Sequence, residues 1–431
     1  MNKTSRNVAL DAIIRVFKYG DTLDRALYYS KQYKNLSDRE RRFSSLILLT
    51  TLRRLGEIDE VINHFMERQL NPRHIITRNI LRITTAQILF LNTPAYAGVS
   101  SAVNLASAHP SSAPLRGFVN AILRRIAEDG LKQLNNIDSE KVNMPPWLWE
   151  KMVITHGDHI TRKISRAQQL EVSLDLTLKN PKDCYKWADI LSATRLPNNS
   201  LRLFKPGAVE SLKGFSDGAW WVQDAAASLP AQLLGNISGK KGVDLCAAPG
   251  GKTAQLLSAG AEVIAVEESS SRLERLKDNL HRLKLCAEII NCDALVYKPK
   301  HLVDFVLLDA PCSATGTIRR HPEVPWTRSQ SDLAKLLKKQ DMLLDAAAKM
   351  IAPGGKLVYT VCSLMPEEGV EKINTFLDKN PQLERKTYNF SGIGAPYESQ
   401  NRFMDLETLP CHWADFGGLD GFFAACLQRR Y

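Results

Sequence analysis

The sequence predicts an α/β protein in which a basic all-helical region and a small α+β region precede a helix-covered parallel sheet. Three observations predict this class. Apolar residues recur at helical spacing through the first 130 residues. Short alternating segments follow between about 144 and 235. After Gly242, buried strands alternate with helices, which is typical of a parallel sheet with both faces covered.

The first third of the chain is predicted to be helical and carries most of the net charge. Apolar residues recur at helical spacing, and Pro72, Pro94 and Pro110 punctuate the pattern. Residues 1–130 hold 19 Lys+Arg against 11 Asp+Glu, a net +8 of the total +11. Basic residues form helical clusters at Arg39, Arg41 and Arg42, at Arg53 and Arg54, and at Arg124 and Arg125. Such a face suits a phosphate backbone, but charge alone does not exclude an ordinary solvated helical surface.

The middle of the chain gives a weaker pattern. Residues 129–143 are expected to be a linker, because the helical periodicity dissolves there into glycine, asparagine and aspartate. Residues 174–179 and 201–204 alternate like half-buried strands, and 218–226 is predicted to enter a helix. Trp220 and Trp221 could stack on a base, although an aromatic core is the favoured interpretation.

A glycine loop organises the C-terminal half. A short apolar run that ends in Asp244 and Leu245 breaks at Pro249, Gly250 and Gly251 and leads into a helix start. A strand, a glycine turn and a helix N-terminus together offer backbone N–H groups to a nucleotide-like ligand. Cys246 occupies the position of the first P-loop glycine, and the dinucleotide pattern is also absent. The loop therefore suits a nucleoside ligand without a triphosphate, such as S-adenosylmethionine, with an ordinary strand-to-helix turn as the alternative.

Several acids and a thiol follow the predicted strands. Strands are expected at 261–266, 287–290, 303–308 and 356–361, with helices at 271–285 and 331–350 between them. Glu267, Asp293, Asp309 and Cys362 fall at or just beyond strand ends, where ligands bind in such sheets. Glu267 is placed to accept hydrogen bonds from ribose hydroxyls, and Asp293 could meet an adenine amino group. We therefore expect these side chains to converge on one crevice with the glycine loop.

Two thiols lie in the most specific motifs. The first is Asp309-Ala310-Pro311-Cys312-Ser313-Ala314-Thr315-Gly316-Thr317, and the second is Cys362-Ser363 after a later strand. Small residues on the first loop would let a planar base approach closely. The eight cysteines form no C-x-x-C pair or Cys/His cluster, so we expect neither a metal site nor a disulfide scaffold. Two thiols beside a methyl-donor pocket favour a catalytic role for these cysteines over a purely structural role as buried side chains.

With these motifs, the whole chain resembles the RsmB/Sun (Fmu) family of bacterial ribosomal RNA cytosine-C5 methyltransferases. The resemblance covers the basic helical region, Gln223-Asp224, the run from Cys246 to Lys252, both cysteine motifs and Asp420-Gly421-Phe422-Phe423. It implies a NusB-like RNA-binding domain (1–135), a small α+β connecting domain (144–235) and a Rossmann-like methyltransferase domain (236–431). Glu267 departs from the usual aspartate, and Val361 stands where threonine is common.

The resemblance also implies the roles of the residues. Cys362 would attack carbon 6 of cytosine, Asp309 would bind or protonate the ring at N3, and Cys312 would assist release of the carbon 5 proton. Lys252 is a possible aid to ionisation of Cys362. The expected cofactor, S-adenosyl-L-methionine, would be held by Cys246, Ala247, Ala248, Pro249, Gly250, Gly251, Lys252, Glu267, Asp293 and Asp309. The expected partner is 16S ribosomal RNA of the small subunit.

Other interpretations stay open at this stage. Pro311-Cys312 makes Cys312 a rival nucleophile, since DNA cytosine methyltransferases use the cysteine of such a dipeptide. Two alternative functions are cytosine-C5 methylation of another RNA, such as tRNA, and a non-catalytic role as an RNA-binding antitermination-type factor. A P-loop ATPase is disfavoured by Cys246. Ile75 to Leu91 is the most apolar stretch, but Arg78 and Arg82 interrupt it. We expect a cytoplasmic monomer that binds no membrane.

Overall fold

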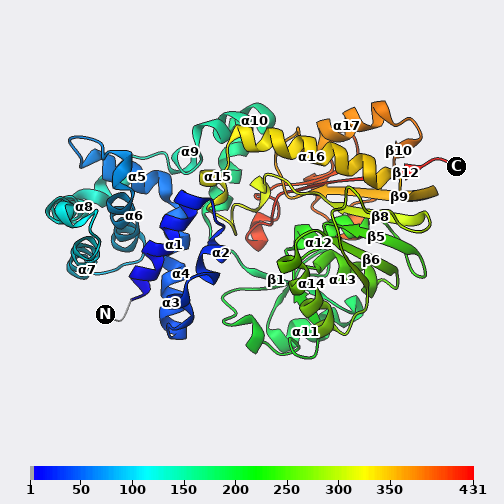
Figure 1. Cartoon of the computed structure of the whole chain (residues 1–431), viewed down its shortest axis with the longest axis horizontal. Helices are drawn as coiled ribbons and strands as arrows, with labels where there is room; N and C mark the ends of the chain where they lie inside the picture. The colour runs from blue at the N-terminus through cyan, green and yellow to red at the C-terminus, as the bar shows by residue number, and fades with distance from the viewer. Residues whose placement is uncertain (1–3) are drawn as a thin grey trace. The chain divides into compact units, whose positions relative to one another are not determined.

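The computed structural model describes residues 4–431, which divide into two compact units (Figure 1). The first unit runs to Gln169 and also includes Ile318–Arg328. The second holds Leu170–Thr317 and Ser329–Tyr431. No helix within the described residues is long and apolar enough to cross a membrane.

The first unit is entirely helical, as the periodicity predicts. Its longer helices are α1 (Ser5–Tyr19), α4 (Asp38–Arg53), α5 (Leu55–His64), α6 (Ile75–Phe90), α7 (Ala95–Ala108), α8 (Arg116–Leu134) and α10 (Pro146–Gln169). Short helices are α2 (Leu23–Tyr28), α3 (Lys31–Lys34), α9 (Ser139–Val142) and α15 (Val324–Thr327). Apolar residues of α1, α4, α5, α6, α7 and α8 form one buried core. Because α8 runs to Leu134 and α9 follows, much of the expected linker is helical.

Many arginines of the first unit are used inside it. Arg78 and Arg82 both pair with Asp59, at 3.0 and 2.6 Å. Arg54 pairs with Glu57 at 3.1 Å. Arg39, Arg42, Arg124 and Arg125 are instead exposed. Fewer unpaired basic side chains are therefore available on the surface of this unit than the number of basic residues suggests.

The segment that follows the first cysteine motif belongs to the helical unit. The Glu323 carboxylate is 1% exposed and accepts a 3.0 Å hydrogen bond from the Leu23 N–H. The Trp326 indole donates to the Leu52 carbonyl at 3.1 Å. These long-range bonds bind α15 to α2 and α4 within one unit.

The second unit contains two sheets. The smaller is antiparallel with the order β2-β3-β1-β4. Its strands are β1 (Leu174–Leu178), β2 (Thr194–Arg195), β3 (Leu201–Leu203) and β4 (Trp220–Val222). Two of these strands match the alternating segments, but β4 lies where a helix entry was expected, and α12 begins only at Ala225. Trp220 and Trp221 are 0% and 4% exposed, which supports the aromatic-core interpretation.

The larger sheet carries the sequence motifs and has the order β10-β12-β9-β8-β5-β6-β7. Its parallel strands are β5 (Lys241–Leu245), β6 (Glu262–Glu267), β7 (Glu288–Asn291), β8 (Val303–Asp309) and β9 (Ile351–Val361). The sheet is mixed rather than wholly parallel, because β12 (Phe422–Arg429) pairs antiparallel with β9. The strands β10 (Leu383–Arg385) and β11 (Leu406–Thr408) extend this edge against β12.

Helices cover both faces of the large sheet, which makes a three-layer Rossmann-like fold. Along β8 and β9, Val306, Leu308 and Tyr359 share one core with α16 (Gln330–Ala348) and α17 (Val370–Lys379). Phe305, Leu307 and Val358 point the other way, into a core with α12 (Ala225–Gln232) and α13 (Gly251–Ser258). A fifth covering helix is α14 (Ser270–Leu283) (Figure 1).

Candidate active site

The carboxyl ends of the parallel strands surround one cavity of about 190 Å³. Because these ends meet at one edge of the sheet, residues far apart in the sequence line the same space. The predicted residues among them are Cys246, Glu267, Asp293, Asp309, Cys312 and Cys362. Arg272, Glu268 and Lys339 also line it. The expected convergence of the strand-end acids and thiols is therefore present in the structure.

The glycine loop joins β5 to α13 and borders this cavity. Buried Asp244 accepts a 2.6 Å hydrogen bond from the Thr253 hydroxyl, which fastens the strand end to the helix. Burial raises the pKa of Asp244 to about 7. Gly250 adopts φ of +103°, and a Cβ built there would come 2.7 Å from Leu276. Glycine is required by that backbone conformation as well as by the close packing.

The acid at the end of β6 holds the loop in place. Glu267 is 1% exposed, and its carboxylate accepts hydrogen bonds from the N–H groups of Ala248 (3.3 Å) and Ser269 (3.0 Å). Arg272 approaches the same carboxylate at 3.5 Å. The next acid, Asp293, accepts a 3.0 Å hydrogen bond from the Leu295 N–H. Both acids are thus oriented by backbone donors beside the cavity.

The two thiols of the cysteine motifs face each other. The Sγ atoms of Cys312 and Cys362 lie 3.4 Å apart. The hydrogen bond with Cys362, together with burial, raises the pKa of Cys312 well above its usual value. Burial also raises the pKa of Cys246, to about 12, so this third thiol stays protonated at neutral pH.

Lys252 is bound to Asp309 rather than to a thiol. Its ammonium donates to the Asp309 carboxylate at 2.7 Å, and the lysine side chain is only 9% exposed. It also lies 5.2 Å from the centre of the Phe422 ring. The expectation that Lys252 helps Cys362 to ionise gains no support from this contact. The lysine instead holds Asp309 at the mouth of the cavity.

A buried carboxylate that the sequence motifs do not indicate links the two cysteine loops. Glu368 is 0% exposed, and its oxygens accept hydrogen bonds from the backbone N–H and hydroxyl of Ser313 (2.9 and 2.5 Å). They also accept from the Ser363 hydroxyl (2.5 Å) and the Gln340 amide (2.9 Å). Ser313 and Ser363 each follow a cysteine directly. The repeated Cys-Ser dipeptide was the signal that could have indicated a shared partner.

Two glycines bring the first cysteine loop against the C-terminal strand. The Gly316 N–H donates to the Cys362 carbonyl at 3.0 Å, and the Gly421 N–H donates to the Gly316 carbonyl at 2.8 Å. A Cβ at Gly316 would come 1.9 Å from the Gly421 carbonyl oxygen. No side chain fits between these backbones, so Gly316 and the Asp420-Gly421 turn are needed for the loops to meet.

The structure separates the remaining predicted cofactor residues from the cavity lining. Ala247 and Ala248 are buried in a core with Trp221. Pro249, Gly250 and Gly251 lead into α13, and the Pro249 carbonyl accepts a 2.9 Å hydrogen bond from Asn279. Among residues 4–431, no three His, Cys, Asp or Glu side chains gather in a way that could hold a metal ion.

Comparisons with known proteins agree with this architecture. Residues 231–428 match the family model of 16S rRNA methyltransferase RsmB/F, and residues 3–128 match that of the NusB family. The chain is 31% identical to ribosomal RNA small subunit methyltransferase B of Citrobacter koseri, with 99% of each chain covered. It is 32% identical to the protein of the same name from Proteus mirabilis, over 99% of this chain and 98% of that one.

Solved structures share the fold. The crystal structure of PH0851 is 24% identical, with a TM-score of 0.78 over 98% of both chains. The structure of NSun6 from Pyrococcus horikoshii with SFG is 19% identical, with a TM-score of 0.57. It covers 67% of this chain and 98% of that chain.

Proposed function

Because the chain belongs to the RsmB/F family of 16S rRNA methyltransferases, we propose that it methylates carbon 5 of a cytosine in 16S ribosomal RNA through a covalent cysteine–cytosine adduct. Family membership makes it an S-adenosylmethionine-dependent RNA methyltransferase. The atom that is methylated and the covalent route are the proposal. The observation that carries it is the pair of facing thiols beside Asp309 in one cavity.

The cavity residues fit a nucleoside-bearing methyl donor. Bound S-adenosylmethionine supplies a methyl group made electrophilic by its sulfonium. Glu267 would accept hydrogen bonds from the ribose hydroxyls, and Asp293 from the adenine amino group. Cys246 would border the ligand from the cavity wall, and the loop as far as Gly251 would support that wall from behind. Lys252 and Asp309 would lie at the side of the target base. This assignment rests on the carboxylates that line the strand-end cavity.

Cys362 is the proposed nucleophile. Carbon 5 of cytosine is a poor nucleophile, so a thiolate must first form a bond to carbon 6 and push electron density onto carbon 5. Asp309 would hydrogen-bond or protonate N3, and the ammonium of its partner Lys252 would stabilise the negative charge that develops toward that atom. Family membership, rather than the pKa of either thiol, favours Cys362 over Cys312 for this attack.

Cys312 is proposed to complete the reaction. After methylation, carbon 5 must lose its proton so that the bond between carbon 6 and Cys362 can break. Once Cys362 is bonded to carbon, its sulfur no longer carries a charge that opposes ionisation of Cys312. Cys312 can then lose its own thiol proton to solvent and, as a thiolate, accept the carbon 5 proton. The electrons of the broken C–H bond re-form the double bond between carbons 5 and 6 and expel the Cys362 thiolate.

The helical region is proposed to hold the RNA. We retain the division into a NusB-like RNA-binding domain (1–135), a connecting domain (144–235) and a methyltransferase domain (236–431). The exposed arginines of α4 and α8 would contact phosphates, while the target cytosine, unpaired or flipped out, enters the cavity. A purely RNA-binding antitermination role would leave the paired thiols and the Glu368 network without use.

Mapping 5-methylcytosine in ribosomal RNA tests the proposal. RNA from cells with the gene deleted should lack one 5-methylcytosine of 16S RNA, and the gene with intact Cys362 should restore it. Restoration of a tRNA modification instead would redirect the proposal to another substrate. A methyl group on a different cytosine atom would contradict the covalent route.

A further inference from the structure

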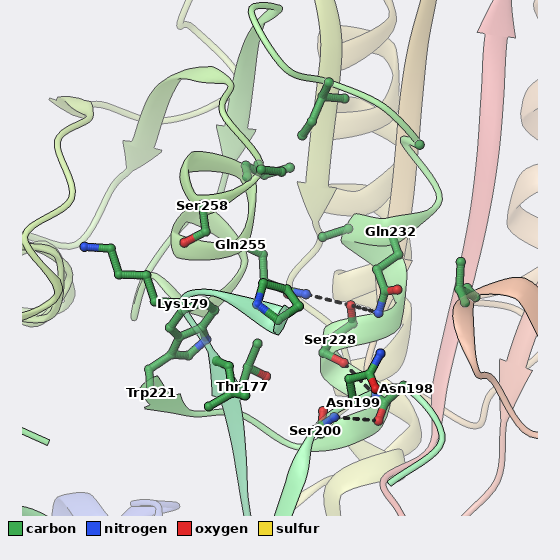
Figure 2. Close-up of a pocket in the computed structure, with 18 residues that line it drawn as sticks. Thr177, Lys179, Asn198, Asn199, Ser200, Trp221, Ser228, Gln232, Gln255 and Ser258 are labelled. Carbon is green, nitrogen blue, oxygen red and sulfur yellow. Dashed lines mark hydrogen bonds between the residues drawn. The ribbon is translucent and has the colours of Figure 1, made fainter. Parts of the chain in front are cut away.

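The tryptophans of the small sheet are not available to stack on a base. Figure 2 shows Trp221 in the wall of a cavity of about 350 Å³ beside α12 and α13. The residue is buried, and its indole already donates to the Gln223 side chain at 2.8 Å. Trp220 is buried as well. A stacking surface for an unpaired base therefore requires exposed rings, and three of these lie close together in the helical unit.

The three exposed rings are tyrosines at the ends of the first two helices. Tyr19 is the last residue of α1, Tyr28 is the last residue of α2, and Tyr29 follows it directly. These residues are 61%, 58% and 55% exposed, respectively. Gly20 ends α1 in the left-handed conformation, with φ of +66°, and so turns the chain toward α2. Helices α1 and α2 then contact each other (Figure 1).

Positively charged side chains lie over these rings and connect them into one surface. The Cζ atom of Arg15 lies 5.5 Å from the centre of the Tyr19 ring and 5.4 Å from that of Tyr29. The Tyr28 and Tyr29 rings meet edge to face, with their centres 5.5 Å apart. Three further cation–ring contacts complete the row: Lys18 with Tyr19 (5.3 Å), Arg25 with Tyr29 (5.6 Å) and Lys34 with Tyr28 (4.5 Å). These residues together form what we call the tyrosine–cation strip.

One buried carboxylate holds the strip in place without neutralising it. Asp21 is buried and pairs with Arg15 at 2.5 Å and with Arg25 at 3.3 Å, so two guanidinium groups share one carboxylate. Residues 15–34 contain five basic and two acidic side chains, which leaves this surface positively charged. Because the ion pairs and ring contacts already fix the side chains, less conformational entropy is lost when a ligand binds.

We propose that the tyrosine–cation strip binds a short run of unpaired nucleotides in the RNA substrate, an inference that rests on the proposed function for the presence of that substrate. Cations and exposed rings alternate along the strip, as phosphates and bases alternate along a single strand. Bases stack on the three tyrosines, while the lysines and Arg25 contact phosphates. Paired bases are enclosed within a duplex, so the strip selects single strands. It thereby adds base contacts to the phosphate contacts proposed for α4 and α8.

Fluorescence anisotropy with two labelled RNAs tests this inference on the full chain. One RNA is a short single strand of mixed sequence, and the other has the same backbone with abasic sites in place of the bases. Tyr19→Ala, Tyr28→Ala and Tyr29→Ala combined should weaken binding of the intact strand by about tenfold, because the stacking contacts are lost. Binding of the abasic strand should not change.

Two further variants control for the loss of side chains. Tyr19→Phe, Tyr28→Phe and Tyr29→Phe combined keeps the rings and should bind the intact strand as the wild type does. Tyr96→Ala removes an 81% exposed tyrosine of α7, outside the strip, and should also leave the affinity unchanged.

Two results would overturn the inference, provided that the alanine variant shows native thermal unfolding. Wild-type affinity for the intact strand would leave the strip as a surface for another partner, such as an acidic protein. An equal loss of affinity for both RNAs would show that only phosphates are contacted. The readout is binding rather than methyl transfer. Unaltered 5-methylcytosine after gene deletion would therefore contradict the proposed function without removing a base-dependent affinity, which distinguishes the two failures.

Discussion

The sulfur atoms of Cys312 and Cys362 lie 3.4 Å apart although 50 positions separate the residues. The parallel pairing of Asp309 with Thr360 sets this distance, because each cysteine lies two or three residues beyond that pair. Two thiols so close cannot both ionise readily, since the first thiolate opposes the second. The two thiols therefore form one coupled unit, in which ionisation of either sulfur opposes ionisation of the other.

Glu368→Gln should slow methyl transfer without weakening cofactor binding. The substitution removes the charge that accepts bonds from both cysteine loops, so the thiols should lose their alignment. We expect kcat to fall about 10- to 100-fold, as small misplacements of reacting groups do, with an unchanged S-adenosylmethionine Kd. The exposed Glu371→Gln serves as the matched control. Wild-type kcat in Glu368→Gln would show that the network has no positioning role.

Glu267→Ala should weaken S-adenosylmethionine binding. Loss of the carboxylate removes the proposed ribose contact and the bond to the Ala248 N–H. The expected loss is about 1–3 kcal/mol, measured by titration calorimetry. Glu262→Ala changes an exposed acid at the opposite end of the same strand and should bind normally. An unaltered affinity in Glu267→Ala would remove this acid from the cofactor site. Gly250→Val should weaken binding further, because valine cannot readily adopt φ of +103°.

Asp244 should make stability depend on pH. Its pKa of about 7 lies above the unfolded value, so the folded state holds the proton more tightly. The resulting stabilisation is complete below about pH 4 and declines as the pH rises through about 7. Relative to wild type, Asp244→Asn should gain about 2 kcal/mol of unfolding free energy between pH 5.5 and 8. Denaturant titrations at both pH values measure this, with exposed Asp278→Asn as the control. A pH-independent difference would contradict the burial argument.

The exposed arginines should carry much of the RNA affinity. Replacing Arg39, Arg42, Arg124 and Arg125 by glutamine should lower the affinity for 16S RNA and flatten its salt dependence. Each lost phosphate contact should reduce the logarithmic salt slope by roughly 0.7–0.9. Lys298→Gln with Lys300→Gln removes two exposed charges from the other unit and should leave the salt slope unchanged. An unchanged salt slope in the quadruple variant would show that these arginines are solvated and do not contact RNA phosphates.

Much of the site could be predicted because the sequence shows where the strands end. Apolar runs that stop at Glu267, Asp309 and Cys362 locate the carboxyl edge of a parallel sheet, and that edge gathers its own side chains. The Glu368 network was not predictable in this way. Gln340 reaches it from the middle of α16, and its contact depends on how that helix packs on the sheet.

The antiparallel edge of the sheet was missed for a related reason. Phe422–Arg429 is an apolar run whose partner cannot be read from alternation alone. Strand β9 begins at Ile351 rather than at the expected residue 356, and a register shift against β8 absorbs the extra residues, which include Pro353-Gly354-Gly355. The sequence also does not distinguish the arginines that form internal ion pairs from those that stay exposed. The partners of Arg54, Arg78 and Arg82 become known only when the helices are packed.

The most direct test of the account asks which cysteine becomes attached to RNA. Purified Cys362→Ala and Cys312→Ala are each mixed with target RNA and S-adenosylmethionine and run on denaturing gels. If Cys362 attacks, Cys312→Ala transfers the methyl group but stalls before release, so it accumulates a denaturant-stable adduct through Cys362. Cys362→Ala should form no adduct and have no activity. An adduct from Cys362→Ala, with none from Cys312→Ala, would contradict the assignment and make Cys312 the nucleophile.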